Sequence, residues 1–255
     1  MISIITITFN NFKELKNTLE SIPQREFIES VIINGGNDPR TLEYLRKYKG
    51  IVINEKDSGI ADAFNKGIRN STGEFVMFLN SGDILHDQNY PGIAQKIMNE
   101  NRDISFVHSN IYFHDSIGGE IFMSPQMRSV GRGQPYFHPT MVMRKNIFDQ
   151  VGYFNTSYKM GMDFDLIVRM TKKGLKGKYL DVKPVVKMEG TGISAVREKD
   201  AIKECYRSLK ENNYLTCRNR FGFLKRKLFY SGRMVLLFLG MKNILGSLKR
   251  IKHSE

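Results

Sequence analysis

The first eighty residues alternate short apolar runs with helical patterns, and this order constrains the fold more than any other feature. The apolar runs cover residues 2–8, 30–33, 51–54 and 75–79. Each run is bounded by turn residues, which is typical of buried strands. Strands separated by helices are joined by right-handed crossovers. The sequence therefore predicts an α/β fold of the nucleotide-binding kind, with a mostly parallel sheet flanked by helices.

The second half is less regular but carries the same kinds of element. We expect strands over residues 105–114, 141–143 and 179–186, and helices over residues 147–151, 163–172 and 199–212. The clearest change in composition falls near residue 215. The sequence thus predicts one domain over residues 1–215, followed by a tail over residues 216–255. A chain of 255 residues is long enough for one sizeable core.

Polar side chains follow each of the first four predicted strands. They are Thr6, Thr8 and Asn10, then Asn34 and Asp38, then Glu55, Asp57 and Asp62, and finally Asp83. The carboxyl ends of parallel strands share one edge of a sheet, where open α/β folds bind ligands. Asn, Asp and Gly are also ordinary turn formers. The pattern therefore indicates a ligand site and leaves a purely structural role open at each position.

Seven segments stand in a distinctive order and spacing. They are Thr6–Asn10, Ile33–Gly36, Glu55–Gly67, Thr72–Asp83, His138, Gly161–Arg169 and Gly190–Ser194. Together they resemble the family 2 glycosyltransferases, and more narrowly the bacterial enzymes of surface-polysaccharide assembly. The resemblance implies a GT-A fold and inverting transfer of a sugar. The donor would be a nucleoside diphosphate sugar, and the acceptor a hydroxyl of a glycan or of a lipid-linked sugar.

The resemblance also implies roles on the donor side. Thr6 and Asn10 would lie near the nucleoside, and Asp57 and Asp62 would line the donor pocket. Asn34 stands where the family usually has an Asp that contacts the base. The amide of Asn34 can still donate and accept hydrogen bonds, but the change from Asp leaves the identity of the base open. We expect UDP first and GDP second.

The turn Asn80-Ser81-Gly82-Asp83 matches the metal motif of the family. Asp83 corresponds to its last acid and would hold Mg²⁺ or Mn²⁺, which prefer oxygen ligands. Asn80 and Gly82 stand where other members often carry further acids. We therefore expect weak metal binding, with diphosphate and water completing the coordination shell.

On the acceptor side, the resemblance assigns the catalytic base to Asp163. Such a base must lie within hydrogen-bond reach of the attacking hydroxyl. An Asp at the start of a helix is also a common N-cap, so both roles remain open. Asp165 is the alternative base on this side, and His138 would face the acceptor.

The chain is basic, with 39 Lys and Arg against 26 Asp and Glu, and most of the surplus lies in the tail. Large apolar residues interleave there with basic ones, as in Phe221, Leu224, Lys225 and Leu228. This pattern predicts basic amphipathic helices that lie on an anionic membrane. Helices packed against the catalytic domain or a dimer partner are the alternative. The tail glycines are expected to divide it into short helices: Gly222, Gly232, Gly240 and Gly246.

Several features bear on the cellular location. The longest apolar run of the tail, Met234–Met241, is far shorter than the ~20 residues of a membrane-spanning helix. The chain opens directly on a predicted strand, without the pattern of a signal peptide. Its two cysteines are too few for a disulfide framework. We expect a cytoplasmic protein that is peripheral on the inner face of the cell membrane.

Other functions fit the sequence less well. A nucleotidyltransferase needs a glycine-rich basic loop after its first strand, and residues 8–13 contain no glycine. A nucleic-acid-binding protein carries basic and aromatic residues along an exposed face, whereas here the charge lies in an apolar tail, so no nucleic-acid partner is expected. A catalytically weak or inactive membrane-associated scaffold stays open because the metal motif has few acids.

Overall fold

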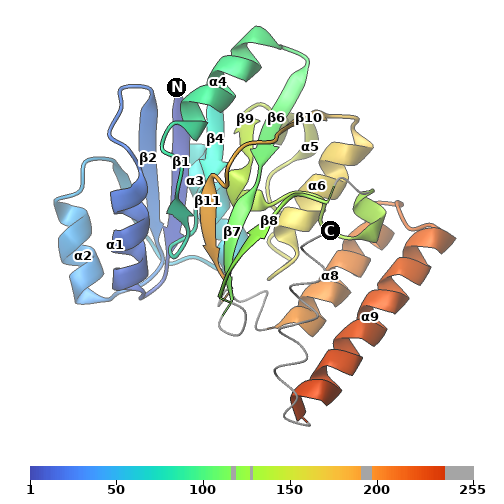
Figure 1. Ribbon diagram of the computed structural model, residues 1–255. Coiled ribbons are helices and arrows are strands. Elements are labelled where there is room, and N and C mark those ends of the chain that lie inside the picture. The colour runs from blue at the N-terminus through green and yellow to red at the C-terminus, as the bar shows by residue number, and fades with distance from the viewer. Residues whose placement is uncertain (116–118, 127–128, 191–196, 239–255) are drawn as a thin grey trace.

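A seven-stranded sheet forms the centre of the protein (Figure 1). The computed structural model describes residues 1–115, 119–126, 129–190 and 197–238. The strands of this sheet, in spatial order, are β10 (Lys176–Leu180), β6 (Ile104–Ser109), β9 (Val142–Arg144), β4 (Phe75–Phe78), β1 (Ile2–Thr8), β2 (Ile28–Asn34) and β3 (Ile51–Asn54). β9 runs antiparallel to both neighbours, and the other pairs are parallel. The predicted mostly parallel sheet is confirmed.

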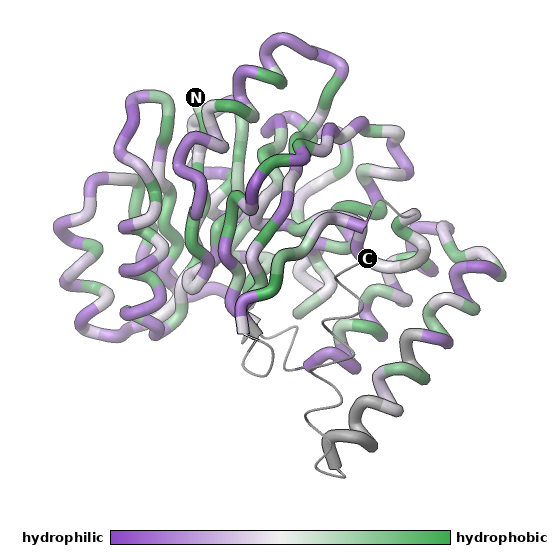
Figure 2. Tube along the Cα trace, in the orientation of Figure 1, coloured by the Kyte–Doolittle hydropathy of each residue, from purple (hydrophilic) through white to green (hydrophobic). Residues whose placement is uncertain are grey.

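Helices cover both faces of this sheet. One face packs against α1 (Phe12–Ser21), α2 (Pro39–Arg46) and α4 (Tyr90–Glu100), and the other against α3 (Ile60–Asn70), α5 (Ile147–Val151) and α6 (Met162–Lys172). Because side chains alternate along a strand, Ile4 of β1 joins Leu15 in one core and Ile5 joins Phe64 in the other. Figure 2 shows the resulting concentration of hydrophobic residues in the central strands.

A second, smaller sheet extends the first. Its strands, in spatial order, are β5 (Ile84–Leu85), β11 (Val186–Glu189), β7 (Ile111–Asp115) and β8 (Gly119–Met123). The single strand predicted over residues 105–114 is therefore wrong, because the chain turns at Asn110 from β6 into β7. The buried Asn110 holds this corner, and its Nδ2 donates to the carbonyl of Val182 at 2.6 Å. The strand predicted over residues 179–186 is likewise divided, between β10 and β11.

The C-terminal helices α8 (Glu198–Glu211) and α9 (Cys217–Phe238) pack against each other, with the rings of Tyr206 and Phe223 5.8 Å apart. The predicted helix breaks at Gly222 and Gly232 are wrong, since α9 continues through both. A helical glycine costs only about 1 kcal/mol relative to Ala, and packing on α8 favours the continuous helix. Gly240 and Gly246 lie outside the described residues. No helix in the described part of the chain is both long and apolar enough to cross a bilayer.

Candidate active site

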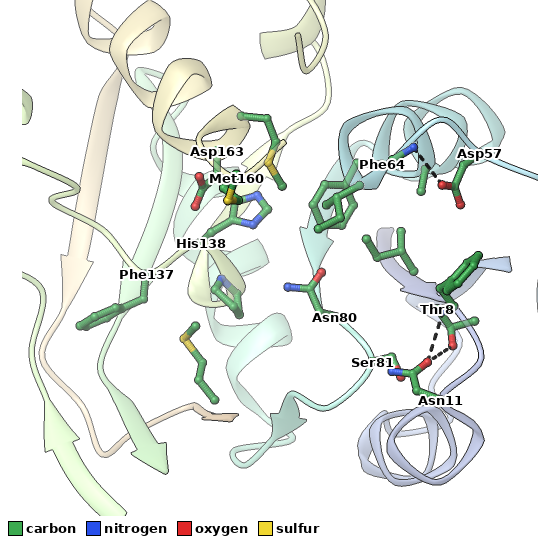
Figure 3. Close-up of a pocket in the computed structure, with 18 of the residues that line it drawn as sticks. Thr8, Asn11, Asp57, Phe64, Asn80, Ser81, Phe137, His138, Met160 and Asp163 are labelled. Carbon is green, nitrogen blue, oxygen red and sulfur yellow. Dashed lines mark hydrogen bonds between the residues drawn. The ribbon is translucent and has the colours of Figure 1, made fainter. Parts of the chain in front are cut away.

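A cavity of about 680 Å³ opens at the carboxyl ends of β1 and β4 (Figure 3). One wall consists of the turn after β1, the turn after β4 and the start of α3. The other wall consists of residues 134–139 and the start of α6. We call these the strand wall and the helix wall. The cavity therefore lies at the sheet edge where the sequence predicts a ligand site.

The structure brings only some of the predicted residues to this cavity. Asp57, His138 and Asp163 line it. The other predicted site residues do not appear in its lining: Thr6, Asn10, Asn34, Asp62, Asp83 and Asp165. On the strand wall, the cavity is lined instead by their neighbours Thr8, Asn11, Asn80 and Ser81. The pattern of polar strand ends thus located the correct turns, but only Thr8 and Asp57 of its residues line the cavity.

Asn10 and Asn34 connect the turns behind the strand wall. Asn10 has a φ of 54°, and its Oδ1 accepts from the backbone N–H of Asn37 at 2.8 Å and of Asp38 at 2.9 Å. Asn34 is buried, and its Nδ2 donates to Asn54 Oδ1 at 3.0 Å. Both amides therefore bind neighbouring turns and fix the shape of this wall.

Asp57 and Asp62 shape the entry to α3. Asp57 Oδ1 accepts from the backbone N–H of Gly59 at 3.0 Å, while its side chain reaches the cavity. Asp62 Oδ2 accepts from the backbone N–H of Ser58 at 3.0 Å. This hydrogen bond, together with the nearby charge of Lys66, lowers the pKa of Asp62. Asp62 therefore stabilises the start of the helix.

Asp163 lies in the first turn of α6 and faces the cavity. The N-cap of this helix is Gly161, so Asp163 does not fill the capping role that the sequence left open. Its Oδ2 accepts from Gln134 Nε2 at 2.7 Å, and its Oδ1 accepts from the backbone N–H of Phe164 at 2.7 Å. The carboxylate is therefore held in one orientation on the helix wall.

Asp165 lies on the same helix but belongs to a different environment. It is only 2% exposed, and its carboxylate pairs with Arg169 Nε at 2.8 Å. It also accepts from Ser208 Oγ at 2.8 Å and Asn212 Nδ2 at 3.0 Å, both from the α8 region. Asp165 thus joins α6 to α8, and this geometry does not favour the alternative in which it acts as the base.

His138 contributes a buried imidazole to the helix wall. Its ring stacks on Phe78 at 5.0 Å and meets Phe64 edge-on at 5.5 Å. Burial lowers the pKa of His138, and the charge of Asp163 opposes this effect only in part. The imidazole is therefore neutral at pH 7. Its Nε2 is buried without a hydrogen-bond partner among the described residues, which leaves this atom available to a bound ligand.

Two positioning contacts could not be found from the sequence. Gln134 holds Asp163, although 29 residues separate them. Glu204 of α8 accepts from the backbone N–H groups of Met160 and Gly161, both at 2.8 Å, just before α6 begins. No motif or spacing links these residues, because the contacts arise only when distant elements pack together.

The structure does not bring Asp83, the predicted ligand of Mg²⁺ or Mn²⁺, to the lining of the cavity. Asp83 is buried behind the turn, and its Oδ2 accepts from the backbone N–H of Asn80 at 3.1 Å. Among the described residues, no group of three or more His, Cys, Asp or Glu side chains is arranged to hold a metal ion. The residues present therefore do not fit a divalent cation held by several carboxylates.

The comparisons with known proteins agree with this architecture. The sequence matches the glycosyl transferase family 2 over residues 3–167, and the chain belongs to this family. Family membership supports glycosyl transfer as its activity. A PGL/p-HBAD biosynthesis glycosyltransferase of Mycobacterium tuberculosis is 23% identical over 80% of this chain and 83% of that protein. An uncharacterized glycosyltransferase of Methanocaldococcus jannaschii is 23% identical over 94% and 88%.

Solved structures show that the fold is GT-A. Residues 1–349 of Staphylococcus aureus TarS, solved with UDP-GlcNAc, superpose with a TM-score of 0.64 at 16% identity, over 83% of this chain and 65% of that one. This chain spans only 39% of the longer TarS structure. The mannosyltransferase PcManGT of Pyrobaculum calidifontis, solved with GDP-Man and Mn²⁺, gives a TM-score of 0.59 at 14% identity, over 100% and 88%. The predicted family and fold are both confirmed.

Proposed function

We propose that this protein is an inverting glycosyltransferase of polysaccharide biosynthesis. It would move a hexosyl or related group from a nucleoside diphosphate sugar to a hydroxyl of a glycan or lipid-linked acceptor. The observation that carries the proposal is the carboxylate of Asp163, which lines the cavity across from the turns after β1 and β4 (Figure 3). A single displacement requires the base and the leaving group on opposite sides of the anomeric carbon. A donor on the strand wall and a base on the helix wall would have this arrangement.

In this reaction, Asp163 accepts the proton of the acceptor hydroxyl as its oxygen attacks the anomeric carbon. The new glycosidic C–O bond forms while the bond from that carbon to the diphosphate oxygen breaks. The bonding electrons leave with the nucleoside diphosphate, and the configuration inverts because the attack is from the opposite face. General base catalysis of this kind contributes roughly 10²–10⁴-fold to a rate. His138, which lines the cavity together with Asp163, would contact the acceptor.

Asp163→Asn tests the assignment of the base. The substitution keeps the size of the side chain and removes its basicity, so we expect kcat to fall by roughly 10²–10⁴-fold. The affinity for UDP or GDP, measured by calorimetry, should stay within about threefold of wild type, because the donor lies on the other wall. Turnover at the wild-type rate would exclude Asp163 as the base.

For the donor, UDP is our first proposal and GDP the second. The support comes from structural neighbours that were solved with UDP-GlcNAc and with GDP-Man. Heating the protein with UDP, GDP, dTDP or CMP distinguishes the candidates, because a nucleotide that binds only the folded state raises the melting temperature. A shift with none of these nucleotides would contradict the nucleotide-sugar proposal and favour the inactive scaffold.

We further propose that α9 holds the protein on the inner face of the cell membrane, near a lipid-linked acceptor. One face of α9 exposes Phe221, Leu224 and Leu228, whose exposed fractions are 59%, 51% and 64%. Basic residues flank this face, and Lys225 lies over the ring of Phe221 at 4.8 Å. Exposed apolar residues among cations suit an anionic lipid surface. The opposite face packs on α8 through Phe223, so the alternative of domain packing accounts for that face only.

The double variant Leu224→Asp, Leu228→Asp tests this attachment in the full chain. Each leucine that enters the lipid contributes roughly 1.5–3 kcal/mol, so binding to phosphatidylglycerol vesicles should weaken by more than about tenfold. The matched control is Ile93→Asp, Val182→Asp, which changes two exposed apolar residues away from α9. Equal sedimentation of both variants with the vesicles would exclude this face of α9 as the anchor.

A further inference from the structure

The turn between β4 and β5 contributes neutral polar residues to the cavity lining. Asn80 and Ser81 line it, whereas Gly82 has no side chain and Asp83 lies behind the turn. Asn80 Oδ1 and Ser81 Oγ are buried without a hydrogen-bond partner among the described residues, although buried polar atoms are usually paired. These side chains bring no negative charge to hold a cation.

Asp83 is committed to the turn itself. Its backbone N–H donates to the Asn80 carbonyl at 2.9 Å, and its Oδ2 accepts from the Asn80 N–H at 3.1 Å. The side chain is only 6% exposed. The other acid near it is Glu189, which is exposed on β11 and does not line the cavity. Asp83 therefore closes the turn and does not line the cavity.

The remaining cavity carboxylates lie on different walls. Asp57 belongs to the entry of α3, whereas Asp163 belongs to α6 (Figure 3). Asp163 is also held by Gln134. Three internal stretches that the structure does not describe, 116–118, 127–128 and 191–196, contain no Asp, Glu, His or Cys in the sequence, whereas the C-terminal stretch 239–255 contains His253 and Glu255. No second carboxylate from the three internal stretches is therefore available to join Asp83 or Asp57 around a cation.

Three helices, α1, α3 and α6, begin at the walls of the cavity, and none of their N-caps makes a side-chain capping hydrogen bond. The N-terminal end of a helix carries a partial positive charge, which favours anions such as phosphates. At α6, Glu204 and Asp163 already accept from the backbone N–H groups. The helix ends that favour an anionic ligand are therefore those of α1 and α3, and the carboxylates of Asp57 and Asp163 oppose their effect.

From these contacts we infer that the protein binds the diphosphate of its donor without a divalent cation held by protein carboxylates. The inference rests on the proposed function, since it concerns the same donor site. According to this inference, nucleotide binding does not depend on a metal because the side chains of the β4–β5 turn are neutral. A single carboxylate placed there would therefore create a dependence on Mn²⁺ that the wild-type protein lacks.

Calorimetric titration of UDP and GDP, each with MnCl₂ or with excess EDTA, tests this inference. For the wild type we expect the Kd values in the two conditions to agree within about threefold. Asn80→Asp is nearly isosteric and faces the cavity, so its Kd should be at least about tenfold lower with Mn²⁺ than with EDTA. Ser81→Asp provides a second test at the next position. Asn99→Asp, on the exposed surface of α4, is the matched control and should behave as the wild type.

Each outcome has a distinct meaning. Wild-type binding that requires Mn²⁺ would overturn the inference and leave the proposed function intact. If neither Asn80→Asp nor Ser81→Asp gains a Mn²⁺ effect, the neutral turn is not the cause, and the inference is also wrong. If neither nucleotide binds in either condition, the proposed function itself fails, and the inference fails with it.

Discussion

The two walls of the cavity are built from similar residue types but use them differently. On the strand wall, Asn10, Asn34 and Asp83 direct their polar atoms to neighbouring turns. On the helix wall, His138 and Asp163 direct theirs to the cavity. A polar residue at a strand end is therefore not by itself a ligand-binding residue. What distinguishes the two groups is whether the residue lines the cavity or lies behind its wall and joins neighbouring turns.

The sharpest test of this difference lies within α6, where Asp165 pairs with Arg169 and Asp163 faces the cavity. Asp165→Ala leaves the Arg169 charge without its buried partner, so the free energy of unfolding should fall by roughly 3–5 kcal/mol. Asp163→Asn should change the free energy of unfolding by less than about 1 kcal/mol. Urea denaturation followed by circular dichroism measures both variants. Equal stabilities would mean that the two carboxylates do not differ as the contacts indicate.

The same distinction explains how far the sequence could predict this fold. The bounds of β1, β3 and α5 follow from local hydrophobic patterns, and the structure has them at the predicted residues. The corner at Asn110 was missed because both flanking segments are β-forming, and they are separated into two sheets where Asn110 contacts distant residues such as Val182 and Tyr179. Local sequence patterns predict a helix or strand well when its bounds do not depend on contacts with distant residues.

The candidate site was predictable to the same extent. Asp57, His138 and Asp163 were identified through their motifs and line the cavity. Gln134 was missed because its role depends on a contact with α6 that no sequence spacing encodes. Whether the side chain of Asp83 faces the cavity or the turn depends on one hydrogen bond to Asn80, which a motif cannot reveal.

A second prediction concerns Asp83 and the pH dependence of stability. Burial, with a smaller effect from Glu189, raises the pKa of Asp83 to about 7, whereas the ordinary value is 3.8. Between these values the folded state binds more protons than the unfolded state, so wild-type stability falls as the pH rises through this range. Asp83→Asn removes this loss and can still accept from Asn80. Relative to wild type, the variant should gain roughly 2–3 kcal/mol of stability between pH 5 and pH 8.

Thermal or urea unfolding at the two pH values measures this gain. Because Asp83 closes the turn on the strand wall, nucleotide affinity in EDTA should change by less than about threefold. A stability difference that is the same at both pH values would show that the carboxyl is not protonated in the folded protein, and that its environment is more polar than the contacts indicate.

The smallest predicted effect concerns Gln134, which orients Asp163 on the helix wall through a hydrogen bond of 2.7 Å. Gln134→Leu keeps a similar volume and removes the donor. A hydrogen bond to a charged group contributes roughly 1.5–3 kcal/mol, and part of it is regained from water in the open cavity. We therefore expect kcat to fall by about tenfold, with nucleotide affinity unchanged.

The free energy of unfolding separates positioning of the base from general destabilisation. If Gln134 acts by orienting Asp163, Gln134→Leu should lower kcat while the free energy of unfolding stays within about 1 kcal/mol of wild type. Gln150→Leu, on the exposed surface of α5, is the matched control and should leave both quantities unchanged. If Gln134→Leu lowers kcat and the free energy of unfolding together, Gln134 supports the helix wall only by packing, and the orientation of Asp163 depends on the backbone of α6.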